Sequence, residues 1–138
     1  MEIRELTPDY AVSPQIAPED AAAIAEAGYA SVICNRPDAE VPEGLRADAV
    51  RAAAEAAGLR FVHLPVTHGS ITPELVAAQR EAIGGGRALA YCASGTRSTI
   101  VWALGAAGAM PTDEIVSRAA AAGYDVSGLR DQLGAAGR

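Results

Sequence analysis

The chain has 138 residues, the size of one domain, and half of them are hydrophobic, enough to form a substantial core. No apolar run approaches the length of a membrane span, and Met1 to Glu5 do not begin a signal peptide. The net charge of −6 argues against a nucleic-acid partner held through its phosphates. Two cysteines without metal-site spacing favour a reducing compartment, so we expect a cytoplasmic protein without metal or cofactor. The sequence leaves the oligomeric state open.

The first half of the chain alternates apolar and helical segments. It predicts strands at 3–6 and 10–12, a helix at 18–27, a strand at 29–34, a loop at 36–44 and a helix at 45–57. Thr7-Pro8-Asp9 predicts a hairpin turn between the first two strands. Pro18 and Gly28 are typical start and stop residues of a helix.

The second half continues this alternation. It predicts a strand at 59–66, a loop at 67–71, a helix at 73–83, a strand at 87–91 and helices at about 97–107, 112–122 and 126–136. Thr72 and Thr112 are the predicted N-caps. Strands 29–34, 59–66 and 87–91 are continuous apolar runs, as in parallel strands buried on both faces.

This order predicts an α/β fold with a mostly parallel central sheet of four to five strands, flanked by helices. Such sheets bind ligands at the carboxyl ends of their strands. Three segments fall at these ends, after Cys34, after Val66 and at Cys92, so we expect the functional residues there.

The chemistry is expected in the small-residue loop Cys92-Ala93-Ser94-Gly95-Thr96-Arg97-Ser98, between a strand and a helix. Loop N–H groups and the positive end of the following helix form an anion site, and both favour a thiolate at Cys92. Gly95 permits positive φ, and Arg97 offers a planar fork to an oxyanion. Cys92 as a buried hydrophobe is the alternative, but the small polar neighbours pack poorly and donate well, which favours the functional interpretation.

Loop 92–98 resembles the active loop of cysteine-dependent phosphatases and rhodanese-type sulfurtransferases. The order and spacing of further segments are similar to the beta-lactamase-hydrolase-like, phosphatase-like domain family: Ser13-Pro14-Gln15, residues 32–40, Leu64-Pro65-Val66, Tyr91 to Ser98, and Ala122-Gly123-Tyr124-Asp125. That family occurs alone and fused to metallo-hydrolase domains linked to sulfide oxidation. The resemblance covers nearly the whole chain. It implies a single domain over 1–138, the three-layer sandwich of dual-specificity phosphatases, and chemistry at Cys92 and Arg97.

The length of the loop bears on which reaction it supports. Four residues separate Cys92 from Arg97, one fewer than in the usual phosphatase loop that the resemblance implies. The shorter ring is typical of rhodaneses, whose loop surrounds a single persulfide sulfur.

A phosphatase of this fold also protonates its leaving group with an Asp on an earlier loop, but residues 65–70 contain no carboxylate. His68 on that loop and Asp38 after the first core strand are the candidate acids. Each has a structural alternative: His68 as a solvated loop histidine, and Asp38 as a turn carboxylate that pairs with Arg36 or caps the following turn.

Three function classes follow. A sulfurtransferase would take a sulfane sulfur onto Cys92 as a persulfide and pass it to a thiol or cyanide. A phosphatase would attack a phosphoester with Cys92, hold the oxygens with Arg97 and use His68 or Asp38 as acid. A non-catalytic module would only bind anions. The first is favoured because sulfur transfer from a good leaving group needs no strong acid, and the substrate is expected to be a small anion or thiol.

Cys34 closes the predicted strand 29–34, as Cys92 follows strand 87–91. If these strands are neighbours, Cys34 is a possible redox partner that traps oxidised Cys92 as a disulfide. The alternative is that Cys34 only packs in the core.

Overall fold

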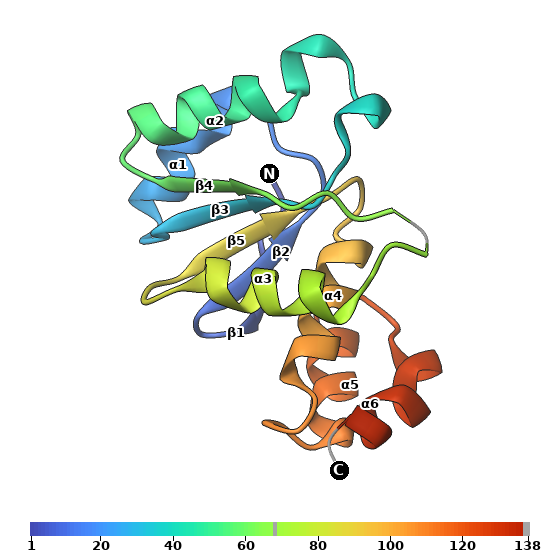
Figure 1. Cartoon of the computed structure of the whole chain (residues 1–138). Coiled ribbons are helices and arrows are strands. Elements are labelled where there is room, and N and C mark those ends of the chain that lie inside the picture. Colours follow the sequence, from blue (N-terminus) through green and yellow to red (C-terminus); the bar gives the residue numbers. More distant parts are fainter. Residues whose placement is uncertain (68, 137–138) are drawn as a thin grey trace.

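The structure, a computed structural model, describes residues 1–67 and 69–136, which are built around a five-stranded sheet (Figure 1). In spatial order the strands are β1 (Arg4–Thr7), β2 (Tyr10–Ser13), β5 (Ala88–Tyr91), β3 (Ser31–Cys34) and β4 (Arg60–His63). β1 pairs with β2 in an antiparallel hairpin, and the other neighbours are parallel. The predicted α/β fold with a mostly parallel sheet is therefore confirmed.

Helices cover both faces of the sheet and make the three layers (Figure 1). The described residues form α1 (Ala21–Glu26), α2 (Ala47–Ala56), α3 (Pro73–Ile83), α4 (Thr96–Ala106), α5 (Thr112–Ala121) and α6 (Arg130–Ala136). Ile24 of α1 and Val50 of α2 pack in one apolar cluster with Leu89. Trp102 of α4 and other residues of α3 to α6 pack in a second cluster with Ala90. Because β5 is buried on both faces, its sequence is apolar throughout.

Helix boundaries depart from the predictions in ways that local bonds explain. Thr72 caps α3 as predicted, because its Oγ1 accepts the Leu75 N–H at 3.1 Å. The predicted cap at Thr112 is wrong, since Thr112 is already helical and Pro111 precedes the helix without a side-chain cap. The predicted helices 18–27 and 126–136 each begin as a short 3-10 turn, Pro18–Asp20 and Ser127–Leu129. A third such turn, Asp38–Glu40, lies in the predicted loop 36–44, and a fourth, Glu43–Leu45, overlaps the end of that loop and the predicted start of the helix 45–57.

The carboxyl ends of the parallel strands bring three loops to one edge of the sheet. Cys34 is in register with Tyr91 on one side and with His63 on the other. The ladder continues past the strands, because Asn35 N–H donates to the Tyr91 carbonyl and Leu64 N–H to the Cys34 carbonyl, both at 2.8 Å. The segments after Cys34 and at Cys92 therefore meet as predicted, and Val66 joins them because its N–H donates to the Asn35 carbonyl at 2.8 Å.

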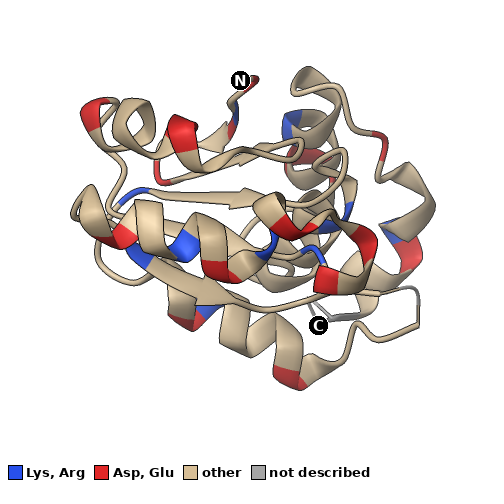
Figure 2. Cartoon of the chain, turned by 90° about the horizontal axis from the view of Figure 1, so that it is seen from above, with Lys and Arg blue, Asp and Glu red and all other residues tan. Residues whose placement is uncertain are grey.

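Acidic and basic positions are interspersed over the ribbon seen from above (Figure 2). In the part of the chain that the structure describes, no helix combines the length and apolar character needed to cross a membrane.

Candidate active site

The small-residue loop wraps around the sulfur of Cys92. Cys92 directly follows β5 and is 1% exposed. The Gly95 N–H donates to Cys92 Sγ at 3.1 Å. Gly95 has φ +94° and is the N-cap of α4, so the positive φ predicted there is confirmed. Its carbonyl accepts from Thr99 N–H at 3.0 Å and from Thr99 Oγ1 at 2.8 Å. One amide and the N-terminal end of α4 thus lie against the sulfur.

Some of the other loop residues line the site, and one of them is buried in the core. Ser94 Oγ lies 2.9 Å from Thr96 Oγ1, and both residues line a hollow of about 470 Å³ beside Arg97. The carbonyl of Ala93, an exposed residue, accepts from the Gln15 N–H at 3.3 Å. Ser98 is fully buried, and its hydroxyl donates to Asn35 at 2.8 Å. Its side chain therefore supports the loop from below.

Arg97 is held by an acidic residue that the sequence did not single out, Glu40. Its Nη1 and Nη2 donate to the two carboxylate oxygens of Glu40 at 2.8 and 2.7 Å, and Nη1 also donates to the Val66 carbonyl at 2.7 Å. Arg36 Nε lies 3.3 Å from the same carboxylate. Because Glu40 and Arg97 lie 57 positions apart in the sequence, no local pattern could have revealed the pair.

The guanidinium of Arg97 interacts electrostatically with both Glu40 and Cys92. The hydrogen bond with Glu40, and more weakly the charge of Cys92, raise the pKa of Arg97. The hydrogen bond from Arg97 in turn lowers the pKa of Glu40, so this carboxyl remains ionised and poorly suited to donate a proton.

The two predicted acids have different outcomes. Asp38 Oδ1 accepts the N–H of Ala47, the first residue of α2, at 2.9 Å, so it caps a helix further along the chain instead of the turn that directly follows it. Its role as an acid stays a prediction. His68 lies outside the described residues.

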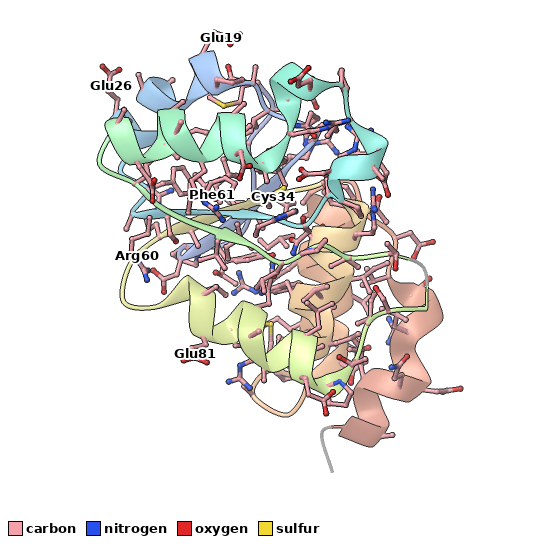
Figure 3. All side chains as sticks on the ribbon, turned by 45° about the horizontal axis from the view of Figure 1, so that its top comes forward. Glu19, Glu26, Cys34, Arg60, Phe61 and Glu81 are labelled. Atoms are coloured by element: carbon pink, nitrogen blue, oxygen red, sulfur yellow. The ribbon has the colours of Figure 1, made fainter. Side chains whose placement is uncertain are left out.

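Cys34 is a buried free thiol, as is Cys92. Its sulfur donates to the Arg36 carbonyl at 3.4 Å, and it packs in the cluster beneath α1 and α2 that also contains Tyr91. Figure 3 places Cys34 in the interior, whereas Glu19 and Glu26 point outward from their helices. Burial raises the pKa of the Cys34 thiol. Its redox role stays a prediction.

A network of buried polar side chains lies beneath the loop, and the sequence did not predict it. Asn35 Nδ2 donates to the Leu64 carbonyl and to Gln79 Oε1, both at 2.9 Å, and Gln79 Nε2 donates to Tyr10 Oη at 3.1 Å. Tyr10 Oη donates to the Ser98 carbonyl at 2.9 Å. The network ties α3 and α4 to β2 and to the end of β3. Asn35 and Gln79 are polar residues beside apolar ones, which is the signal that could have found them.

No group of three or more His, Cys, Asp or Glu side chains among the residues that the structure describes is arranged to hold a metal ion.

Comparison with known sequences identifies the family of the chain. Residues 2–109 match the model of the family described as beta-lactamase hydrolase-like protein, phosphatase-like domain. The chain belongs to this family. The beta-lactamase hydrolase-like protein of Xylella fastidiosa (strain Temecula1) is 36% identical over 130 residues, which cover 91% of this chain and 30% of that protein. The chain thus spans less than a third of the length of this curated relative.

Solved structures confirm the phosphatase-like fold. A putative phosphatase from Neisseria meningitidis is 38% identical, with a TM-score of 0.85 over 99% of both chains. TpbA from P. aeruginosa, solved in complex with pTyr, is 18% identical, with a TM-score of 0.61 over 95% of this chain and 89% of that one. The chain therefore has the same fold as these phosphatase structures.

Proposed function

We propose that this domain transfers a sulfane sulfur through a persulfide on Cys92. The observation that carries the proposal is that Glu40 and Asp38, two carboxylates on the segment after β3, already have partners within the protein. Glu40 is held ionised by Arg97 and Arg36, and Asp38 caps α2. These contacts leave neither carboxylate directed at a leaving group, which supports a reaction that needs no general acid from the described part of the chain.

Sulfur transfer meets that requirement. Cys92 Sγ attacks the outer sulfur of a donor such as thiosulfate, a bond forms between the two sulfurs, and the donor's S–S bond breaks. The electron pair leaves with sulfite, which needs no proton. The terminal sulfur of the Cys92 persulfide keeps the negative charge, near the Gly95 N–H and the start of α4. An acceptor thiolate or cyanide then takes this sulfur and restores the Cys92 thiolate.

Phosphoester hydrolysis is the second candidate. It is favoured by the family's phosphatase-like fold and by the putative phosphatase that matches over nearly the whole chain. In that reaction Cys92 would form a phosphocysteine, Arg97 would leave Glu40 to hold the oxygens, and the leaving alcohol would need a proton from an acid such as His68 or Asp38.

Parallel assays separate the two reactions. Purified protein is supplied with thiosulfate and cyanide, with thiocyanate as the readout, and separately with an aryl phosphate. We expect thiocyanate formation that Cys92→Ser abolishes and Cys34→Ala retains, and one added sulfur atom on the Cys92 peptide by mass spectrometry. Aryl phosphate hydrolysis without thiocyanate would assign phosphatase activity instead. Anion binding without either reaction would leave a binding module.

A further inference from the structure

Tyr124 reaches the active loop from a distant part of the chain, beyond the residues 2–109 that match the family model. It follows α5, and its Oη donates to the Ser94 carbonyl at 2.8 Å. Tyr124 is 6% exposed, and the Arg4 guanidinium lies 5.3 Å from the centre of its ring. The side chain is therefore held rigidly against the loop.

The peptide bond between Ser94 and Gly95 connects this tyrosine to the nucleophile. In a trans peptide the C=O and the N–H point in opposite directions. Tyr124 holds the oxygen of this peptide, and its N–H donates to Cys92 Sγ at 3.1 Å. The next peptide is held by Thr99, which donates twice to the Gly95 carbonyl. Tyr124 and Thr99 thus fix both peptide planes that flank Gly95.

The fit between Tyr124 and Gly95 is close. A Cβ at position 95 would lie 2.1 Å from Tyr124 Oη, so only glycine allows this approach, in addition to its positive φ. Without the hydroxyl, the Ser94 carbonyl loses this partner, and the flexible backbone of Gly95 allows the Ser94–Gly95 peptide to tilt. Ser94 is exposed, so water can take its carbonyl.

We propose that Tyr124 is a positioning residue for Cys92: its hydrogen bond to the Ser94 carbonyl aims the Gly95 N–H at the sulfur and so stabilises the charged nucleophile. The same charge is needed for attack on sulfur or on phosphorus, so the proposal requires only that Cys92 is the nucleophile. Burial raises the pKa of Tyr124, which keeps its hydroxyl a donor at neutral pH. Among the described residues, Tyr10, Cys34 and Arg97 also interact electrostatically with Cys92.

Tyr124→Phe tests the proposal, with Tyr29→Phe as a matched control. Tyr29 is 7% exposed and lies under the Arg87 guanidinium at 4.4 Å, and its hydroxyl accepts from Arg87, away from the loop. We expect alkylation of Cys92 by iodoacetamide at neutral pH to slow about tenfold in Tyr124→Phe, the effect of about one net hydrogen bond, and less than twofold in the control. In whichever reaction the protein catalyses, kcat should fall similarly while KM changes less than twofold.

Circular dichroism and thermal melting report whether the variants fold. Alkylation of Cys92 does not depend on which reaction the domain catalyses, so a failure of sulfur transfer leaves this test intact. An alkylation rate in Tyr124→Phe within twofold of wild type, or equal slowing in both variants, would overturn the proposal.

Discussion

Arg97 contacts its partners through the planar geometry of its guanidinium. Two nitrogens meet the two oxygens of Glu40, and one of them also reaches the Val66 carbonyl. A lysine ammonium is a point charge and cannot reproduce this fork. We expect Arg97→Lys to reduce kcat/KM by roughly a hundredfold, the effect of losing a well-placed donor, with little change in circular dichroism. Unchanged kinetics would show that Arg97 only links the loops.

Glu40 gives the site an acid-sensitive ion pair. The hydrogen bond from Arg97 lowers the pKa of Glu40 in the folded protein, so the pair stabilises the fold at pH values above the ordinary Glu range. This stabilisation is lost as pH falls through the lowered value. The difference in Tm between wild type and Glu40→Gln should be greatest at neutral pH and should shrink as the pH falls through and below the ordinary range of a Glu carboxyl. Since Glu40 is about one-third exposed, we expect less than about 1 kcal/mol. A difference that grows with acid would contradict this assignment.

The start of α2 depends on a carboxylate from an earlier turn. Asp38 satisfies the N–H of Ala47, the first residue of the helix. We expect Asp38→Ala to lower the free energy of unfolding by about 1 kcal/mol, whereas Asp38→Asn, which keeps an acceptor oxygen, should lose much less. Both variants should retain turnover, measured beside chemical denaturation. Loss of turnover in Asp38→Asn with unchanged stability would identify Asp38 as the general acid.

The pairing of β3 with β5 sets the geometry for oxidation. Cys34 is in register with Tyr91, the residue before Cys92, so the two cysteines lie on adjacent strand ends. If Cys34 resolves oxidised Cys92, dilute peroxide should give a linked Cys34–Cys92 peptide in wild type and sulfinic acid at Cys92 in Cys34→Ala. Peptide mapping by mass spectrometry separates these products. Sulfinic acid in the wild-type protein, with no linked peptide, would make Cys34 a packing residue.

Across the whole molecule, the sequence was informative where contacts are local. The apolar runs and the helix signals predicted the sheet and the order of its helices, and Gly95 predicted a left-handed turn because few other residues adopt one. The contacts of Glu40 and Tyr124 with the active loop could not be predicted, because both residues reach it only after folding, and the family resemblance covered their segments without giving either residue a role. An isolated carboxylate or tyrosine can take many structural roles, and one sequence does not show which role such a residue has in the fold.

The C-terminal helices pack in one apolar cluster with residues of the sheet. The family match ends at residue 109, yet Ile115, Tyr124 and Leu133 are buried in one cluster with Trp102 of α4. A chain cut after residue 109 would expose that face of α4 and lose the hydroxyl that holds the Ser94 carbonyl. We expect residues 1–109 to show no cooperative thermal transition, and Leu133→Ala in the full chain to cost about 2–5 kcal/mol. A folded 1–109 fragment whose Cys92 alkylates at the wild-type rate would instead make the C-terminal helices an accessory and contradict the single domain over 1–138.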